Sequence, residues 1–541
     1  MNTDKTGIFF SHNTPQACRD SICSILGTNP TTQFEKYLGL PSIVGRAKRR
    51  AFNEIKDRVW KRLQGWKEKL LSQAGREILI KAVIQAIPTY VMSCFKLPAG
   101  LCADISAMAT RFWWGQRGSE RKIHWLSRHR LNQPKKKGGI GFRDLQLFNK
   151  ALLARQGWRI MQCPASLVSR VLKAKYFPHS SFLEAQIPSN ASYTWRSICE
   201  AKEVLIMGLR WRVGSGEKIK VWHDKWIPSP STYKVISPIS SLADDATVDQ
   251  LINPVTIRWD VSMLESVFLA RDVDLIQSIP LSKRKPKDVL IWHETKSGYF
   301  SVKSAYGMLL ANQSAPEASS SSSEGFASQC WSAIWSASVQ PKIRVFLWRA
   351  CKGILPTQAK LFDRGISHTY SCLWCGEDAE IVDHVLWQCE FAQRVWKECS
   401  AGLPLSFDVN WSFMEFITRC SLDLASPALE IAYTTAWVIS KARNDLIWND
   451  HLSTVSDICQ QAAVQAIDYI ESCDNLVVAR PGVAGPSFIK WLPPDRLNFK
   501  LNLSCVMGLE NSQLGLGVLV RDSMGFVGAA RCSRMYGGVM D

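Results

Sequence analysis

The chain has 541 residues, of which 46% are hydrophobic and 21% are charged, so it can bury several cores and is not a disordered polyelectrolyte. Its net charge of +19 lies at one end: residues 1–150 hold 27 Lys/Arg against 10 Asp/Glu, whereas the other 391 residues hold 39 against 37. Such a cationic end favours a polyanionic partner, either nucleic acid or an anionic membrane surface.

The sequence predicts neither a secretory signal nor a membrane span. Residues 1–10 lack a basic segment followed by an apolar one, and the most apolar stretch, 78–95, is interrupted by Lys81, Gln85 and Pro88. We therefore expect an intracellular protein, with the nucleus as a candidate location. In a reducing compartment, clustered members of its 17 cysteines are more typical of metal sites than of disulfides.

Apolar spacing predicts helices in the first third of the chain. Residues 47–71 form an amphipathic pattern, and a second helix is expected over 74–87, with Ser72 as its N-cap and Pro88 at its end. The stripe expected to be buried in this second helix is Ile78, Leu79, Ala82, Val83, Ala86 and Ile87. Further helical segments are expected over 101–114 and 145–175, and a basic, turn-rich stretch lies between them at 117–141.

Composition divides the chain into six segments, and the expected fold class is mainly α and multidomain. In chain order, these are a basic helical region at 1–175, a Trp-rich connector with short strands at 176–310, a Ser-rich linker at 311–329, a helical domain with a Cys/His cluster at 330–470, a second linker at 471–490 and a β-rich tail at 491–541.

Residues 372–389, CLWCGEDAEIVDHVLWQC, have the ligand spacing of a zinc site. Cys372 and Cys375 form a C-x-x-C turn, which places two thiolates on one metal at about 2.3 Å, and His384 and Cys389 complete a set of four. Gly376 supplies the positive φ that such a turn needs. Four protein ligands leave no open position, so the expected Zn²⁺ is structural and not catalytic.

The two later ligands impose a condition on the backbone. His384 and Cys389 are five residues apart and would diverge by about 140° on a continuous helix, so a helix break or a tightened turn is expected between Val385 and Cys389. Two spare ligands are His368 and Cys399. The alternative is a small helical domain whose buried cysteines bind no metal.

Basic residues in and around the predicted helices are the candidate phosphate contacts. They are Arg46, Arg49, Arg50, Arg76, Lys81, Arg121, Lys122, Arg128, Arg130, Lys135, Lys136 and Lys137. Trp113, Trp114 and Trp125 are interleaved with this charge and offer stacking surfaces, although core packing is the commoner role of a single Trp. The alternative for the charges is a solvated face that only keeps the protein soluble.

Several motifs together resemble one family. The stretch from KYLGLPSIVGR to SCFKLP at 36–98 is followed by FWWG at 112–115, KIHW at 122–125, KKKGGIGFRDL at 135–145 and WRVGSGEKIKVWHDKW at 211–226. This order resembles the C-terminal portion of plant non-LTR (LINE-type) retrotransposon reverse transcriptases. The resemblance implies a helical thumb and connection, a helical reverse-transcriptase zinc-binding domain around 331–399, and the truncated α/β start of an RNase H-like domain from Trp491.

The acidic residues depart from the family's catalytic patterns. Intact members hold Mg²⁺ on the carboxylates of a Y-A-D-D palm hairpin, and the resemblance places nearly all of the palm before Met1. The nearest match, Leu242-Ala243-Asp244-Asp245, follows the thumb-like region in a polar stretch, which indicates a decoy. In the tail, Ser504 stands where the family has its first metal-binding Asp, and a hydroxyl cannot replace a bridging carboxylate. We expect no catalytic residue in this chain.

The leading hypothesis is a catalytically inactive remnant of a LINE-type RNA-directed DNA polymerase. It is expected to bind RNA or an RNA–DNA duplex without sequence preference through the basic thumb, and to carry a structural Zn²⁺, with Mg²⁺ needed only by the intact family enzyme. Two alternatives remain. The chain is part of an active reverse transcriptase completed by an upstream exon, or it is a zinc-containing protein-interaction module.

Overall fold

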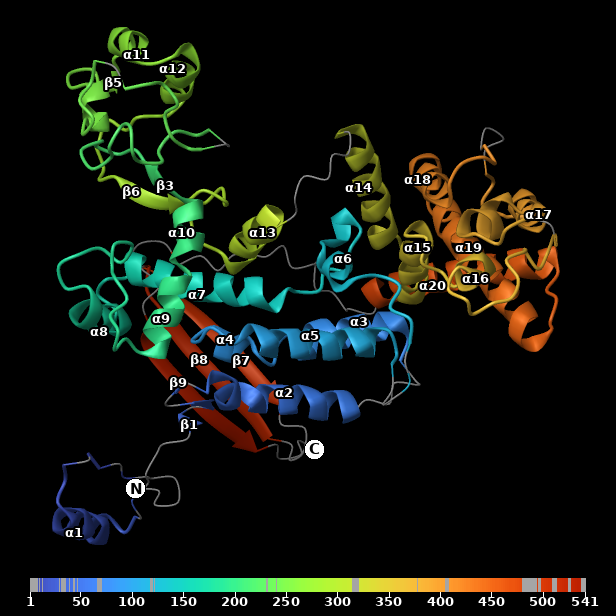
Figure 1. Cartoon of the computed structure of the whole chain (residues 1–541), viewed down its shortest axis with the longest axis horizontal. Helices are drawn as coiled ribbons and strands as arrows, with labels where there is room; N and C mark the ends of the chain where they lie inside the picture. The colour runs from blue at the N-terminus through green and yellow to red at the C-terminus, as the bar shows by residue number, and fades with distance from the viewer. Residues whose placement is uncertain are drawn as a thin grey trace. The chain divides into compact units, whose positions relative to one another are not determined.

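The computed structural model describes residues 8–478, 494 and 498–536, apart from short gaps at 9, 12, 29, 31–35, 38, 42–43, 46, 66–70, 117–119, 121, 230–231, 240, 314–320, 377, 404–407, 508–512 and 524–526. The described chain is mainly helical, as predicted (Figure 1). It divides into two compact units, Met1–Tyr469 and Ile470–Asp541. None of its helices, within the part described, is long and apolar enough to cross a membrane.

Residues 8–208 are largely helical. The elements are α1 (Gln16–Leu26), β1 (Lys36–Tyr37), β2 (Leu40–Pro41), α2 (Lys48–Gly65), α3 (Gln73–Leu79), the π turn η3 (Ile80–Ile84), α4 (Thr89–Met92), α5 (Ala99–Trp113), α6 (Arg128–Asn132), the 3-10 turn η4 (Lys135–Lys137), α7 (Leu145–Gln162), α8 (Leu167–Tyr176), α9 (Tyr193–Glu200) and α10 (Lys202–Gly208). α2 confirms the helix predicted over 47–71, and it buries Phe52, Ile55, Val59 and Leu63 against α5. Trp66 and Leu70 lie outside the described residues.

The helix predicted over 74–87 begins as expected, but it buries a different face. The Ser72 hydroxyl accepts a hydrogen bond from the Gly75 backbone N–H and caps α3. Ile78 is 62% exposed, whereas Ile80 and Ile84 are fully buried, so the predicted stripe is wrong. The covered face is the one on which α15 and α5 pack, and it includes Glu77, whose carboxylate meets the ammonium groups of Lys81 and Lys135 there. The π turn then shifts the helical register.

The helix predicted over 145–175 is two helices, α7 and α8, because residues between Gln162 and Leu167 break the run. α7 packs against α9, α10 and α13 (Val302–Gln313) around a core centred on Trp195. The Tyr176 ring stacks on Trp195 at 4.7 Å between centroids. This core fixes the base from which the Trp-rich connector extends.

The connector contains short strands, as expected. β3 (Leu209–Arg212) pairs antiparallel with β6 (Val289–Trp292), and the chain between them forms its own small core around Trp226. Its other elements are η5 (Val248–Leu251), β4 (Ile252–Asn253), β5 (Arg258–Trp259), α11 (Val261–Val267) and α12 (Ala270–Gln277). The buried Asp288 carboxylate accepts backbone hydrogen bonds from Gly214, Gly216 and Lys218. These bonds join the two segments by which the chain enters and leaves this lobe.

The Cys/His region is helical, and its beginning differs from the prediction. The elements are α14 (Ser321–Ser336), α15 (Pro341–Cys351), α16 (Gln358–Phe362), the π turn η6 (His384–Gln388), α17 (Glu390–Glu398), α18 (Phe413–Asp423), α19 (Ala428–Asn449) and α20 (Val455–Val478). The Ser-rich stretch 311–329 is not wholly a linker, because α13 and α14 extend into it from both sides. Serine has a moderate helix propensity, and the apolar end of α14 packs on η4 and α18, which supports the helix.

One hydrophobic core joins two parts that the sequence analysis separated. Apolar residues of 52–152 and of 330–466 belong to a single buried cluster, in which α14 contacts η4 and α15 contacts α3. The Trp113 and Trp348 rings meet in this core at 6.4 Å between centroids. The basic helices and the Cys/His region therefore form one continuous body.

The described residues of the second unit after 497 form a three-stranded antiparallel sheet. Its strands are β7 (Lys500–Met507), β8 (Gln513–Arg521) and β9 (Val527–Tyr536), in that order across the sheet. Asp522 follows β8 at the hairpin, as predicted, and Ser504 pairs with Gly517 in the ladder. Of the linker predicted at 471–490, residues up to Val478 continue α20, and 479–490 lie outside the described residues.

Candidate metal centre and basic surface

The C-x-x-C segment folds into a tight hairpin that places both sulfurs on one side. Ser371 and Ala379 form an antiparallel bridge, and the Cys372 N–H donates to the Asp378 carbonyl at 2.7 Å. The Gly376 N–H donates to the Cys372 carbonyl at 2.8 Å, and Gly376 has φ of 79°. This left-handed conformation confirms the role predicted for the glycine.

The backbone between the two later ligands widens where a break or a tightened turn was predicted. Residues 384–388 form the π turn η6, and the Cys389 N–H donates to the His384 carbonyl at 2.7 Å. Cys389 itself is extended, with φ of −58° and ψ of 138°, and α17 starts at the next residue. The predicted helix break before Cys389 is confirmed, but the alternative of a tightened turn is wrong, because the turn is wider than an α-helical one. A hydrogen bond between residues five apart brings them to the same side of the turn.

The four predicted ligands meet at one point. Their ligand atoms all lie within 4.8 Å of one another, with 3.8 Å between the sulfurs of Cys372 and Cys389 and 3.4 Å between the Cys375 sulfur and His384 Nε2. Zn–S bonds of about 2.3 Å at tetrahedral angles give S···S edges of about 3.8 Å. The arrangement therefore fits a zinc site, and among the described residues it is the one cluster of three or more such ligand atoms.

Cys372 and Cys389 share one proton. The hydrogen bond from the Cys389 thiol, helped by backbone N–H groups of Trp374 and Cys375, lowers the pKa of Cys372 to about 4, and the same hydrogen bond raises the pKa of Cys389. Cys372 is therefore the thiolate of the pair, and binding of a metal by both sulfurs would release the shared proton. His384 Nε2 faces the Cys375 sulfur, and Nδ1 lies 3.8 Å from a carboxylate oxygen of the exposed Asp378, too far for a direct hydrogen bond.

The two spare ligands do not belong to this cluster. His368 is exposed, and the Cys399 sulfur lies 3.3 Å from the Thr435 hydroxyl.

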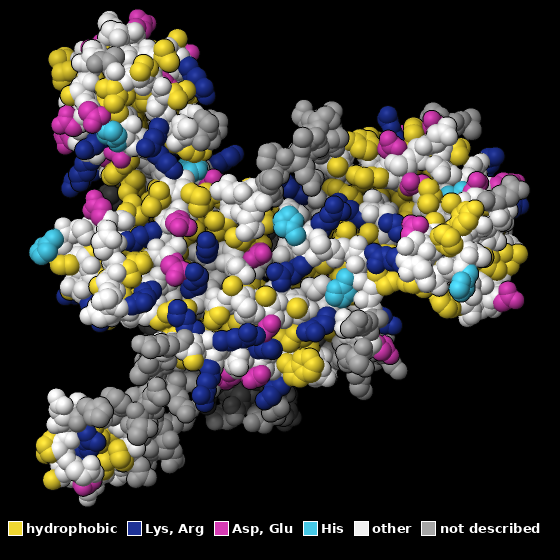
Figure 2. Space-filling view, in the orientation of Figure 1, with side chains coloured by type: hydrophobic (Ala, Val, Ile, Leu, Met, Phe, Trp, Pro, Cys, Tyr) yellow, Lys and Arg dark blue, Asp and Glu magenta, His cyan; other side chains and the backbone are white. Residues whose placement is uncertain are grey.

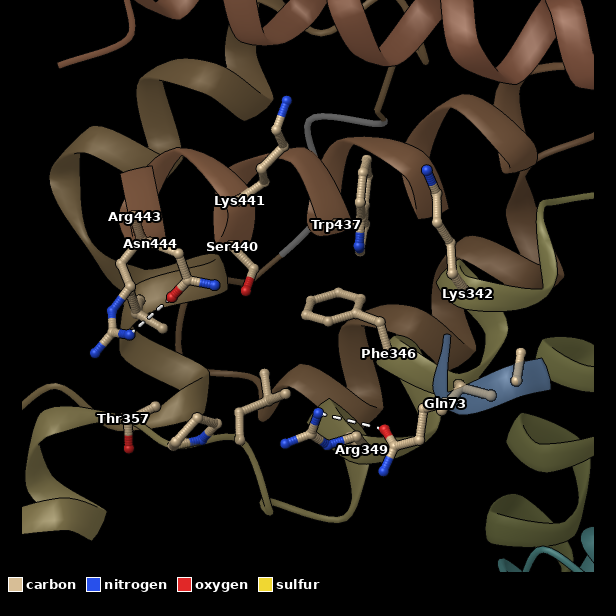
Figure 3. Close-up of a pocket in the computed structure, with 15 residues that line it drawn as sticks. Gln73, Lys342, Phe346, Arg349, Thr357, Trp437, Ser440, Lys441, Arg443 and Asn444 are labelled. Atoms are coloured by element: carbon tan, nitrogen blue, oxygen red, sulfur yellow. Dashed lines mark hydrogen bonds between the residues drawn. The ribbon is translucent and has the colours of Figure 1, made fainter. Parts of the chain in front are cut away.

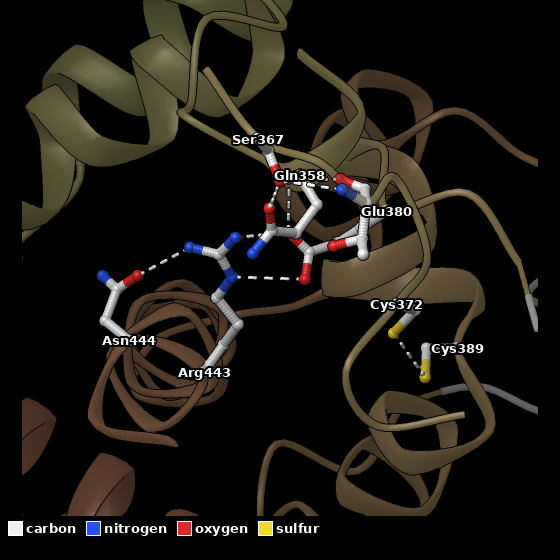
Figure 4. Close-up of polar contacts among 8 residues, drawn as sticks. Gln358, Ser367, Cys372, Glu380, Cys389, Arg443 and Asn444 are labelled. Atoms are coloured by element: carbon white, nitrogen blue, oxygen red, sulfur yellow. Dashed lines mark hydrogen bonds and ion pairs between the residues drawn. The ribbon is translucent and has the colours of Figure 1, made fainter. Parts of the chain in front are cut away.

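A buried ion pair anchors the ligand-bearing segment to α19 (Figure 4). The Glu380 side chain is fully buried, and it accepts hydrogen bonds from both Nη2 and Nε of Arg443 and from the Gln358 backbone N–H at 2.8 Å. Nearby, Asp383 accepts from the Phe413 N–H at 2.8 Å. Sequence reasoning missed this pair, because the partners are 63 residues apart and no local pattern connects them.

The predicted phosphate contacts separate into exposed and partly buried residues, and Arg46 and Arg121 lie outside the described residues. The exposed ones are Arg49, Arg50, Lys122, Arg130, Lys136 and Lys137, and the partly buried ones are Arg76, Lys81, Arg128 and Lys135. Among the exposed residues, Arg49 pairs with Asp104 at 2.6 Å and Lys122 lies 3.7 Å from a Glu120 oxygen. Figure 2 shows Lys and Arg side chains spread over the helical part of the first unit.

Lys81 and Lys135 converge on one carboxylate. Their ammonium groups lie 2.7 and 2.8 Å from the same Glu77 oxygen, and Lys81 also donates to the Ile140 carbonyl at 2.6 Å. Lys135 sits 3.8 Å above the Trp335 ring. Burial lowers the pKa of Lys81 against the opposing effect of Glu77. Both lysines therefore connect the basic helices to the interior and to α14.

The KKKGG motif forms the junction with the Cys/His region. After η4, Gly138 has φ of 75°, and its carbonyl accepts from the Trp348 indole at 3.0 Å. A Cβ at Gly139 would lie 1.9 Å from the Gln133 carbonyl oxygen, so only glycine fits there. Of the three lysines before it, Lys136 and Lys137 are left exposed to solvent.

The acidic pair predicted to be a decoy lies at the surface, where its recorded ion pair is with a histidine. Asp244 and Asp245 are exposed in a turn, and the Asp244 carboxylate lies 3.0 Å from His223 Nε2. Trp125 is partly buried beneath Arg364, 4.8 Å from its guanidinium. Trp113 is fully buried, so core packing accounts for that residue.

Comparison with known proteins adds three findings. Residues 300–396 match the family described as zinc-binding in reverse transcriptase. An Arabidopsis thaliana protein described as a "Putative ribonuclease H protein" is 29% identical over 364 residues, which cover 66% of this chain and 57% of that relative, so the chain spans little more than half of its length. An Arabidopsis thaliana protein described as an "Uncharacterized mitochondrial protein" is 46% identical over 143 residues, which cover 26% of this chain and 93% of that relative.

Proposed function

Because this chain belongs to the plant retrotransposon-derived reverse-transcriptase family that carries a zinc-binding domain, we propose that it binds RNA or an RNA–DNA duplex through its basic helices. Within that family, the motif order from residue 36 to 226 supports a LINE-type origin. The single observation that carries the binding proposal is the +17 net charge of residues 1–150, combined with the exposure of six of the predicted contact residues. Contacts of this kind reach phosphates, so no sequence preference is expected.

A structural Zn²⁺ is the second part of the proposal. Cys372, Cys375, His384 and Cys389 would hold it, and the closed four-ligand set leaves no position for a reacting water. When bound, the ion supplies cross-linking of the hairpin to the π turn. Glu380, which lies between Cys375 and His384 in the sequence, binds Arg443 of α19 and so connects the metal-binding segment to that helix. The ion would thus stabilise the core that the Cys/His region shares with the basic helices.

We further propose that this chain on its own catalyses no polymerisation or RNA hydrolysis. Polymerase chemistry requires two carboxylates that share paired metal ions, and the Asp244–Asp245 pair is an exposed turn with a histidine contact. Ser504 occupies the place of a metal-binding carboxylate in the RNase H-like pattern. The alternative is that a longer protein supplies a palm and is an RNA-directed DNA polymerase, and primer extension by such a protein would favour it.

Binding is tested by fluorescence anisotropy of a labelled RNA–DNA duplex over a series of salt concentrations, with the wild-type chain and Lys136→Glu/Lys137→Glu. These two exposed lysines make no ion pair with a described residue that the structure records, so their replacement leaves the core intact. We expect weaker binding to all sequences alike and a salt slope smaller by about 2, since each phosphate contact contributes about 1.

The charge-matched control is Arg394→Glu/Lys397→Glu, two exposed residues of α17 in the Cys/His region. It is expected to retain at least half of the wild-type affinity. Equal losses in both double variants would indicate binding by net charge alone. The absence of binding even at low salt would reject the proposal and favour the protein-interaction module.

A further inference from the structure

Two pockets adjoin where α3 meets α15, and both are lined by Gln73 and Arg349. One has a volume of about 310 Å³ and lies between α15 and α19, and the other, of about 560 Å³, lies beside the end of α5. We call the pair the α3–α15 cleft. Figure 3 shows the first pocket, with Trp437 and Lys342 on one side, Arg443 and Asn444 on the other, and Arg349 below.

The charge of the α3–α15 cleft is of one sign. Of the described residues that line it, none is Asp or Glu, and six are cationic: Arg76, Lys122, Lys342, Arg349, Lys441 and Arg443. Arg443 is neutralised by Glu380. Lys342 lies 4.2 Å above the Trp437 ring, and both its burial and the charge of Lys441 lower its pKa. Lys122 lies near Glu120, which is outside the cleft lining, and no ion pair of Arg349 with a described residue is recorded.

The cleft also has an excess of hydrogen-bond donors. Arg349 Nε and the indole nitrogens of Trp113 and Trp114 are buried without a hydrogen-bond partner among the described residues. The recorded side-chain hydrogen bond of Arg349 runs from Nη1 to the Gln73 amide oxygen at 3.4 Å (Figure 3). Burial lowers the pKa of Arg349 to about 10. A desolvated guanidinium and unpaired N–H donors are stabilised by an anionic acceptor.

Aromatic rings stand beside these donors. Trp114 stacks against His124 at 6.2 Å between centroids, Trp125 lines the same pocket, and Trp437 lines the neighbouring one. Phosphate-binding cations next to aromatic faces are the combination with which proteins bind single-stranded nucleic acid. Pockets of this size admit an unpaired nucleotide but are too narrow for a base-paired helix, since enzymes must take a base out of the stack to enclose it.

We propose that the α3–α15 cleft binds one or two unpaired nucleotides of a single-stranded nucleic acid, with a phosphate on Arg349 and the Trp114 indole N–H and a base against Trp125, which lines the same pocket as both donors. This rests on the proposed function and adds to it a site for single strands, distinct from the exposed Lys136 and Lys137. The cleft lies between the basic helices and the Cys/His region, both of which contribute walls to it.

The test compares the full chain with Arg349→Met, using a labelled eight-nucleotide oligouridylate and the RNA–DNA duplex as two probes. Loss of a charged hydrogen bond is expected to weaken oligouridylate binding by about tenfold, with duplex affinity changed less than twofold. Arg394→Met, an exposed residue of α17, is the matched control and leaves both affinities unchanged. Arg349→Lys retains part of the single-strand affinity, because the charge remains.

Thermal unfolding separates binding from folding. Arg349→Met removes a desolvated cation, so its Tm is expected to equal or exceed that of the wild type. If that variant does not fold, Trp125→Leu serves as a second test, and loss of one stacking surface is expected to weaken oligouridylate binding by about fivefold or more. Unchanged oligouridylate affinity in the folded variant would overturn the proposal.

Competition identifies the source of the phosphate. Uridine monophosphate is expected to displace the oligouridylate at lower concentration than inorganic phosphate does, because only the nucleotide also offers a base. Equal competition by the two would reduce the cleft to a simple phosphate site and reject the nucleotide assignment. Loss of duplex binding in Lys136→Glu/Lys137→Glu, with oligouridylate binding kept, would show the two sites to be separate, whereas failure of both probes on the wild-type chain refutes the proposed function itself.

Discussion

The Cys/His segment 372–389 and the basic stretch 117–143 are both short runs of one chemical type, yet the fold uses them differently. All four ligands of the first converge within 4.8 Å, because the hairpin and the π turn that arrange them are local. In the second, Lys135 forms an ion pair with the buried Glu77 of α3, whereas Lys136 and Lys137 are exposed to solvent. A metal motif thus carries its geometry in its own spacing, but the role of a surface charge depends on distant partners.

The largest effect is expected when one of the four metal ligands is removed. Cys372→Ser is expected to abolish zinc binding and to unfold the region around 340–400, because the free energy of metal binding is part of the free energy of folding. Metal content per purified chain, expected to be one Zn²⁺, and thermal unfolding with and without a chelator measure this. Cys163→Ser, at an exposed cysteine outside the cluster, is the control. A melting curve of the wild-type chain that is the same with and without the chelator would contradict a structural role of the zinc ion.

The next effect concerns the support behind the ligands. Glu380→Gln leaves Arg443 buried without a countercharge, which is expected to lower the free energy of unfolding by about 3–5 kcal/mol. Urea denaturation of the zinc-bound chain measures it. The double variant Glu380→Gln/Arg443→Met is expected to recover part of the loss, since no unpaired charge remains. A double variant less stable than the single one would mean that the pair's role is packing and not charge compensation.

A smaller effect is expected in the basic region. Glu77→Gln removes the shared partner of Lys81 and Lys135 and is expected to cost about 1–2 kcal/mol, because both ammonium groups keep partial access to water. Denaturation against Glu265→Gln, an exposed position on α11, checks this.

Glu77→Gln is also expected to change how the free energy of unfolding depends on pH. The folded pKa of Lys81 is lowered, so the unfolded state binds more protons between that value and 10.5, and stability contributed by this group rises with pH across that window. In Glu77→Gln the rise is expected to begin at lower pH, because the carboxylate that favours the ammonium is gone. An identical pH profile in the two proteins would argue against the pairing.

Local signals in the sequence were sufficient for some features and not for others. The Ser72 cap, the apolar face of α2, the positive φ of Gly376 and the four metal ligands were all predictable, because each depends on residues close together in the chain, at most 17 apart for the ligands. The direction of the backbone change before Cys389 was not, since a π turn leaves no distinct apolar period.

The missed features share a long-range cause. The exposure of Ile78 and the burial of Ile84 follow from where α15 and α5 pack on α3, and helical periodicity shows only that a face exists, not which one is covered. In the same way, the contacts of Glu380 with Arg443 and of Glu77 with Lys135 join segments 63 and 58 residues apart. The α3–α15 cleft depends on this packing and has no counterpart in any single motif.

The common core of residues 52–152 and 330–466 has a consequence for how such chains diverge. A chimera that takes one half from a distant relative is expected to have mismatched apolar surfaces at Trp113 and Trp348 and therefore to be less stable than either parent. The Trp-rich lobe between them has its own core and joins through β3 and β6, so an exchange of this lobe is expected to disturb the common core less.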